Sequence, residues 1–118
     1  MKKLSVLFSF CITVLIAHEI DIVIPCVEKD LYTLDTCIAH VKKNIEGVRR
    51  VIVVSKEQLT EDAEWFDEAF YPFTMNDIAD SLLRVHKKGK SGREGWYFQQ
   101  MLKMYAPFVI PDISENVM

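Results

Sequence analysis

Two runs of β-branched residues on either side of one amphipathic stretch constrain the fold of this chain most. The runs are residues 20–25 and 49–55, and their near-continuous apolar character is typical of strands that are buried on both faces of a parallel sheet. Between them, apolar residues at alternating spacings of three and four positions predict a helix; they are Leu31, Leu34, Ile38, Val41 and Ile45. A strand, a helix and a strand with short connections form a right-handed crossover. The sequence therefore predicts an α/β fold.

The helix between the two strands carries signals at both ends, and a second helix is predicted after the second strand. Asp30 is placed to cap the first helix, and Gly47 is placed to end it. Thr60 is placed to cap an acidic helix over residues 61–70, which ends before Pro72. The carboxylates of this second helix are expected to form a solvated face.

The second half of the chain is predicted to contain a short helix, a third strand and a long helix. The short helix covers residues 76–83 and the strand covers residues 82–86. The long helix runs from Trp96 and ends at Pro107, which cannot continue the hydrogen-bonding pattern. Its apolar face consists of Phe98, Met101, Leu102, Tyr105 and Ala106.

The ends of the two β-branched runs indicate where a ligand would bind. In open α/β sheets, ligands bind beyond the carboxyl ends of the strands. Residues 25–30 and 55–57 follow the first and second strand, so we expect them at the same edge of the sheet. A sheet of three strands would leave an open edge, which favours self-association.

Composition excludes one broad class of function. The chain has 118 residues, half of them hydrophobic, which is enough for one packed domain. Its net charge of −3 argues against a general nucleic-acid-binding protein, whose domain is usually basic. Positive charge is nevertheless concentrated in residues 84–93, and negative charge in residues 57–68.

The N-terminal segment resembles a targeting sequence. Lys2 and Lys3 precede an apolar run over residues 4–17, which has the length of a signal-peptide core and is short for a membrane span. A signal cleaved after Ala17, an uncleaved anchor and a buried core segment all fit this pattern. We expect residues 1–17 to be a signal or anchor and residues 18–118 to form one domain. The protein would then be exported or membrane-associated through this segment alone, with a cytoplasmic location as the alternative.

The cysteines and histidines do not predict a metal site. Cys26 and Cys37 lack the C-x-x-C spacing of zinc ligands, and the three histidines are scattered. If Cys11 leaves with a signal peptide, the remaining two cysteines could pair; two buried free thiols are the simpler interpretation.

Known phosphate-binding and catalytic motifs are missing from the sequence. Gly89-Lys90-Ser91 matches the end of a P-loop, but Arg84 stands where the first glycine is required. Residues 24–28 contain no glycine, which excludes the dinucleotide-binding fingerprint, and no G-x-S-x-G occurs. What remains is the polar turn with Lys29 and a basic loop before the last helix, a combination that can bind an anion. The alternative is a surface loop without a ligand.

Three stretches together carry a resemblance to a known family. They read IDIVIPCVEKDLYTLDTCI, RRVIVVS and GREGWYFQQMLKMYAPFVIPDISENV. This chain resembles, over residues 20–117, the opening of the DUF6492 family, a bacterial glycosyltransferase-like family of the GT-A, nucleotide-diphospho-sugar transferase type. The phrase GWYFQQMLK is the most specific part of the resemblance.

The resemblance implies a partial GT-A fold that binds a nucleotide-sugar donor of the UDP type at the ends of the first strands. The residues that it places near the donor are Pro25, Glu28, Lys29, Asp30, Ser55, Arg93, Trp96, Gln99 and Gln100. It also implies that Mn²⁺ or Mg²⁺ is held by a D-x-D motif, which in the family follows the IPDISEN stretch. The 118 residues contain no D-x-D, so no metal is expected within this chain.

Two functions follow as expectations. The first is the donor-binding N-terminal half of a glycosyltransferase-like protein, inactive alone because metal and catalytic carboxylates would lie in a continuation of the chain. The second is a small exported α/β binding or interaction protein with no nucleotide role.

Overall fold

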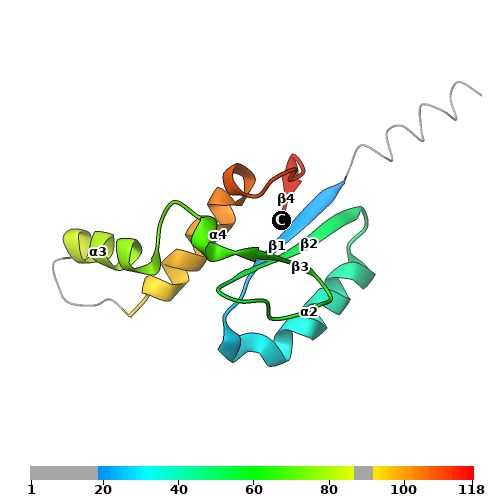
Figure 1. Cartoon of the computed structure of the whole chain (residues 1–118), viewed down its shortest axis with the longest axis horizontal. Helices are drawn as coiled ribbons and strands as arrows, with labels where there is room; N and C mark the ends of the chain where they lie inside the picture. The colour runs from blue at the N-terminus through cyan, green and yellow to red at the C-terminus, as the bar shows by residue number, and fades with distance from the viewer. Residues whose placement is uncertain (1–18, 87–91) are drawn as a thin grey trace, which may run out of the picture.

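A sheet of four parallel strands organises the chain, in the order β3-β2-β1-β4 (Figure 1). We describe residues 19–86 and 92–118 of a computed structural model of this chain. The predicted α/β class with a parallel sheet is confirmed. The strands are β1 (Ile20–Pro25), β2 (Val48–Ser55), β3 (Glu64–Asp67) and β4 (Asn116–Val117).

One helix covers each face of the sheet. The α-helix α2 (Leu31–Asn44) packs on the face formed by Ile22, Val51 and Val53. The α-helix α4 (Glu94–Val109) packs on the opposite face, which presents Val23, Ile52 and Val54. Neighbouring strand residues therefore contribute to opposite cores, as the alternation of side chains along a strand requires. The residues of α2 and α4 buried in these cores are Leu34, Ile38, Phe98, Leu102 and Ala106.

The acidic helix predicted over residues 61–70 is wrong. The chain instead forms β3 and then a 3₁₀ turn, η2 (Glu68–Phe70). Ile52 pairs with Glu64 and Ser55 with Asp67, so β3 satisfies the outer hydrogen-bonding edge of β2. Ala63, Phe66 and Phe70 recur at spacings of three and four, which also fits a helix, so the pairing with β2 and not the local pattern decides the structure of this segment. Its acidic side chains are consequently not a helix face.

The third strand predicted over residues 82–86 is also wrong, because that segment is the end of α3 (Met75–His86). This helix begins with a capping box. The Asp77 carboxylate accepts from the Thr74 backbone N–H at 2.7 Å, and the Thr74 hydroxyl accepts from the Asp77 N–H at 3.3 Å. The short helix predicted over residues 76–83 is confirmed and is longer than expected.

Two predicted helix ends differ from the structure. Asp30 makes no side-chain cap; it belongs to a 3₁₀ turn, η1 (Glu28–Asp30), that leads directly into α2. Pro107 lies inside α4 rather than at its end, because the buried Ala106 and Ile110 keep that face packed on the sheet. Gly47 lies in the turn between α2 and β2 and has a φ of 80°. Glycine adopts this left-handed conformation more easily than other residues.

β4 was not predicted, and polar contacts hold it beside β1. Asp21 is fully buried and receives two hydrogen bonds from Arg49, at 2.9 and 2.5 Å. The Ser114 backbone N–H donates to the same carboxylate at 2.8 Å, and Arg49 also donates to the carbonyl of Asp112. β4 thus covers the edge of β1 that the three-strand prediction left open.

The remaining predictions have mixed outcomes. Cys26 is buried and Cys37 exposed, both as free thiols, so only one of the two expected buried thiols is buried. Residues 1–17, expected to be a signal or anchor, and most of the basic loop lie outside the described residues. Within residues 19–86 and 92–118, no helix is long and apolar enough to cross a membrane.

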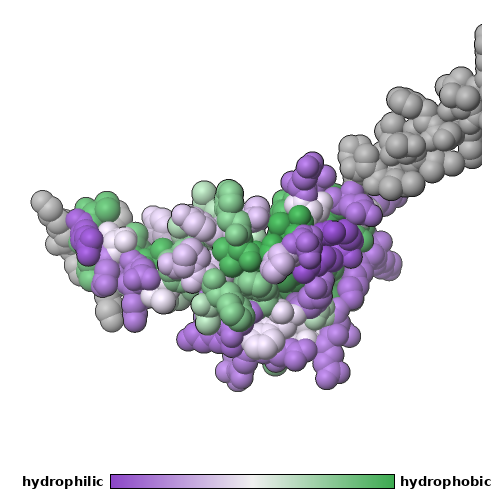
Figure 2. Space-filling model, turned by 45° about the horizontal axis from the view of Figure 1, so that its top comes forward, coloured by the Kyte–Doolittle hydropathy of each residue, from purple (hydrophilic) through white to green (hydrophobic). Residues whose placement is uncertain are grey.

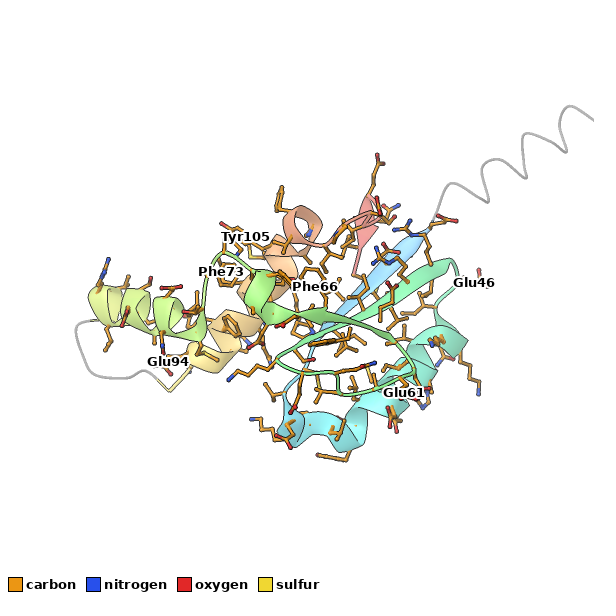
Figure 3. The ribbon with its side chains drawn as sticks, in the orientation of Figure 1. Glu46, Glu61, Phe66, Phe73, Glu94 and Tyr105 are labelled. Atoms are coloured by element: carbon orange, nitrogen blue, oxygen red, sulfur yellow. The ribbon has the colours of Figure 1, made fainter. Side chains whose placement is uncertain are left out.

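An aromatic cluster links η2 to α4. Figure 3 shows Phe66, Phe73 and Tyr105 converging where these elements meet, and the Phe73 and Tyr105 ring centroids are 5.2 Å apart. At its centre Tyr71 is 5% exposed, and its hydroxyl donates to the Leu102 carbonyl at 2.9 Å. The cluster therefore fixes η2 against α4.

Burial raises the pKa of Tyr71 to about 12. Because the raised pKa favours the neutral phenol, its stabilising effect is complete below pH 10 and is lost as the pH rises through 12. We expect Tyr71→Phe to lower the free energy of unfolding by about 1 kcal/mol at neutral pH, through loss of one buried hydrogen bond. Phenolate absorbance during alkaline titration checks that Tyr71 has this raised pKa, since the Tyr71→Phe variant should lack the rise in absorbance near pH 12. An unchanged titration curve would show that another tyrosine gives that rise.

Candidate functional site

A cavity of about 760 Å³ opens beyond the carboxyl ends of β1 and β2. Its volume is in the range of small-molecule sites. The segments that follow β1 and β2 form one side of it, and the start of α4 forms another. The side chains and backbone that line it belong to Pro25, Cys26, Val27, Glu28, Lys29, Asp30, Ser55, Lys56, Glu57, Leu59, Glu68, Met75, Gly92, Gly95, Trp96, Phe98, Gln99 and Leu102.

The two turns that follow the strands are fixed by short hydrogen bonds. The buried Ser55 hydroxyl donates to the carbonyl of Glu57 at 2.7 Å, which bends the chain away from β2. The backbone N–H of Cys26 donates to the Val54 carbonyl at 3.0 Å, so the first turn begins in register with β2. These bonds set the positions from which the charged side chains of both turns face the cavity.

The start of α4 supplies the uncharged part of the lining. Gly92 has a φ of 72°, and the space where a Cβ of Gly92 or Gly95 would stand is empty. Trp96 is 57% exposed, and its ring meets that of Tyr97 edge-on at a centroid distance of 5.0 Å. Phe98 and Leu102 close the inner end, where α4 packs on the sheet.

The structure brings most of the predicted site residues together. Arg93 and Gln100 are the exceptions, because neither lines the cavity. Gln100 follows Gln99 by about 100° around the helix, which turns it away from the cavity side. The predicted residues that do line the cavity are Pro25, Glu28, Lys29, Asp30, Ser55, Trp96 and Gln99.

Several lining residues were not among the predicted site residues. Lys56 lies in the segment 55–57 that was expected at the ligand-binding edge, but it was not named as a site residue. Glu68 and Met75 could not be found in the same way, because the segment before Glu68 was predicted as a helix rather than as the strand β3. Their position depends on pairing between segments that are far apart in sequence.

Negative charge exceeds positive charge around the cavity. The acidic lining residues are Glu28, Asp30, Glu57 and Glu68, and the basic ones are Lys29 and Lys56. Burial raises the pKa of Glu68; the charge of Lys56 lowers it and that of Asp67 raises it further. A bound phosphate would therefore be attracted mainly by the two lysines, one at the end of each strand.

Across residues 19–86 and 92–118, no three His, Cys, Asp or Glu side chains come close enough to hold an ion between them. Mg²⁺ at a nucleotide site is commonly held by one or two carboxylates together with phosphate oxygens of the ligand.

A second hollow of about 540 Å³ lies at the opposite, amino-terminal end of the strands. Its cationic side chains already have partners: Arg49 pairs with Asp21, and the Lys42 ammonium donates to the backbone carbonyl of Asp62 at 2.5 Å. Polar groups that bind each other are less available to a ligand. The cavity at the carboxyl ends is the better candidate site.

Comparison with models of known protein families, with curated proteins and with solved structures found no match to this chain.

Proposed function

We propose that the cavity at the carboxyl ends of β1 and β2 binds the nucleotide-diphosphate part of a nucleotide sugar. The observation that carries this proposal is the convergence of both strand-end turns and the start of α4 on one cavity. The carboxyl edge of a parallel sheet is where α/β proteins bind their ligands. The resemblance to a GT-A glycosyltransferase-like family supports the same ligand class.

The segments after β1 and β2 would bind the diphosphate. Lys29 and Lys56 provide positive charge for the diphosphate. The buried Ser55 and its bond to Glu57 hold the second turn, so that Lys56 is presented from a fixed backbone. The proposed role is binding of the donor, with no catalytic residue assigned within this chain.

Calorimetric titration of the full chain with UDP and UDP-glucose, with and without Mg²⁺, tests the proposed function. We expect measurable binding and a loss of about 5- to 20-fold in affinity for Lys29→Ala, because one charge-assisted contact is removed. Lys43→Ala is the matched control, since Lys43 is exposed on α2 and does not line the cavity. The control should bind like the unmodified protein.

A second function is favoured by the exposed aromatic side chains. Phe70 is 73% exposed and Phe108 is 84% exposed, and Figure 2 shows apolar side chains on the surface over the middle of the molecule. Apolar patches of this kind mark interaction surfaces in many proteins. The absence of UDP and UDP-glucose binding by the unmodified protein up to millimolar concentration would favour this alternative, a binding or interaction protein without a nucleotide role.

A further inference from the structure

Trp96 is unusual among the aromatic residues of the described chain because its large ring lies both exposed and inside a cavity wall. The ring is 57% exposed and lines the cavity from the first turn of α4. Tryptophan is mostly buried in folded proteins, so an exposed ring in a cavity has surface left for another ring. Tyr97 meets it edge-on at 5.0 Å, which limits the orientations that the indole can take.

The α4 side of the cavity differs chemically from the strand side. Its lining residues after position 91 are Gly92, Gly95, Trp96, Phe98, Gln99 and Leu102, none of which is charged. The charged lining residues come from the turns after β1 and β2 and from η2. A ligand with a diphosphate and a planar base has the same division, and it would place its uncharged ring against α4.

Gln99 completes this wall. It lies three residues after Trp96, which places both side chains on one side of the helix, and both line the cavity. Its amide offers an N–H donor beside a C=O acceptor, which matches the paired acceptor and donor on the edge of a nucleobase. Trp96 would then bind the face of the base and Gln99 its edge.

The glycines leave room for a ring to approach. Apart from its chain neighbours and the backbone of its own helix turn, nothing lies within 4 Å of the position that a Cβ on Gly95 would take, and Gly95 itself lines the cavity. A methyl group there would not disturb the free protein, but it would project into space that the ligand needs. A change of Gly95 to alanine can therefore affect ligand binding without an effect on folding.

We propose that Trp96, with Gln99 and the open space at Gly95, is the nucleobase platform of the cavity. This inference rests on the proposed function and adds to it which part of the ligand each wall binds. The α4 wall would bind only the base, and Lys29 and Lys56 would bind the phosphates.

Titration of the full-length chain with two probes, UDP and inorganic pyrophosphate, tests the platform. Stacking of one base on an aromatic residue accounts for about a 5- to 100-fold difference in affinity. We expect Trp96→Ala to weaken UDP binding by that factor, and Trp96→Phe to retain most of it. Pyrophosphate, which has no base, should bind both variants within twofold of the unmodified protein.

Two further variants complete the test. Gly95→Ala should keep or raise the thermal unfolding midpoint, because alanine favours the helix, yet weaken UDP binding. Phe108→Ala, an exposed change on the same helix outside the cavity, should alter neither. UDP binding that is unchanged in Trp96→Ala, or an equal loss for UDP and pyrophosphate, would overturn the platform and leave the proposed function standing. No binding of either probe by the unmodified protein would overturn both.

Discussion

Replacing Leu102 by alanine is expected to lower the free energy of unfolding by about 2–5 kcal/mol, as for other fully buried leucines. Leu102 is 2% exposed and lies where α4 meets Val23 and Ile52 of the sheet. Its backbone carbonyl also accepts the Tyr71 hydroxyl at 2.9 Å, a bond that alanine can still accept, so the loss measures the buried side chain alone. Urea denaturation followed by circular dichroism measures the loss.

Phe108→Ala is the matched control for this change. It removes a larger apolar side chain from the same helix, but Phe108 is 84% exposed and its loss should cost about 0.5 kcal/mol or less. Equal losses for the two variants would show that α4 does not pack on the sheet through the Leu102 face. Since Leu102 also lines the cavity, its replacement is also expected to weaken ligand binding.

The crossover of β1, α2 and β2 could be predicted because its signals are local. Residues 22–24 and 51–54 are unbroken β-branched runs, and the apolar spacing of three and four positions between them is typical of a helix. β3 and β4 could not be predicted in this way. They have four and two residues, and they are strands because β2 and β1 offer unpaired edges beside them. Pairing of this kind leaves no periodic pattern in a segment so short.

The part of the candidate site that follows β1 and β2 could be predicted, because both strands could be predicted. The turns with Lys29 and Ser55 follow from the ends of the two predicted strands, since parallel strands share one carboxyl edge. The resemblance supplied the α4 side, including Trp96 and Gln99. It did not show which face of the helix is turned inward, so Gln100 was included although it lies outside the cavity. That choice depends on packing and not on sequence spacing alone.

The partners of the buried Asp21 carboxylate could not be predicted from the sequence of its strand. A single carboxylate inside an apolar run such as IDIVIP must find a partner when buried. Its partner Arg49 is 28 positions away, and the backbone N–H of Ser114 is 93 positions away. The run indicates that a buried charge needs compensation, and only the fold identifies the groups that provide it.

Replacing Asp21 by asparagine is expected to lower the free energy of unfolding by about 2–4 kcal/mol at pH 7. The change removes the charge from a fully buried site and weakens the hydrogen bonds that Arg49 and Ser114 donate there. Glu64→Gln is the matched control, because Glu64 accepts from Arg50 in a similar paired geometry but is half exposed. Surface pairs contribute about 0–1 kcal/mol, so the control should lose much less. Equal losses would mean that burial of Asp21 has no energetic consequence.

The pH dependence of this difference identifies the carboxylate as its source. The hydrogen bonds from Arg49 hold the pKa of Asp21 below its ordinary value of 3.8, although burial acts in the opposite direction. A lowered pKa in the folded state means that the stabilisation is complete above about pH 4 and is lost as the pH falls through the folded-state value. Urea midpoints of the unmodified protein and Asp21→Asn should therefore differ by a constant amount between pH 5 and pH 7 and converge towards pH 2. The same loss would release the contacts that hold the Ser114 segment and β4 to β1, so hydrogen exchange at Val23 and Met118 should accelerate with it. A difference that stays constant down to pH 2 would assign the effect to packing at Asp21 and not to its charge.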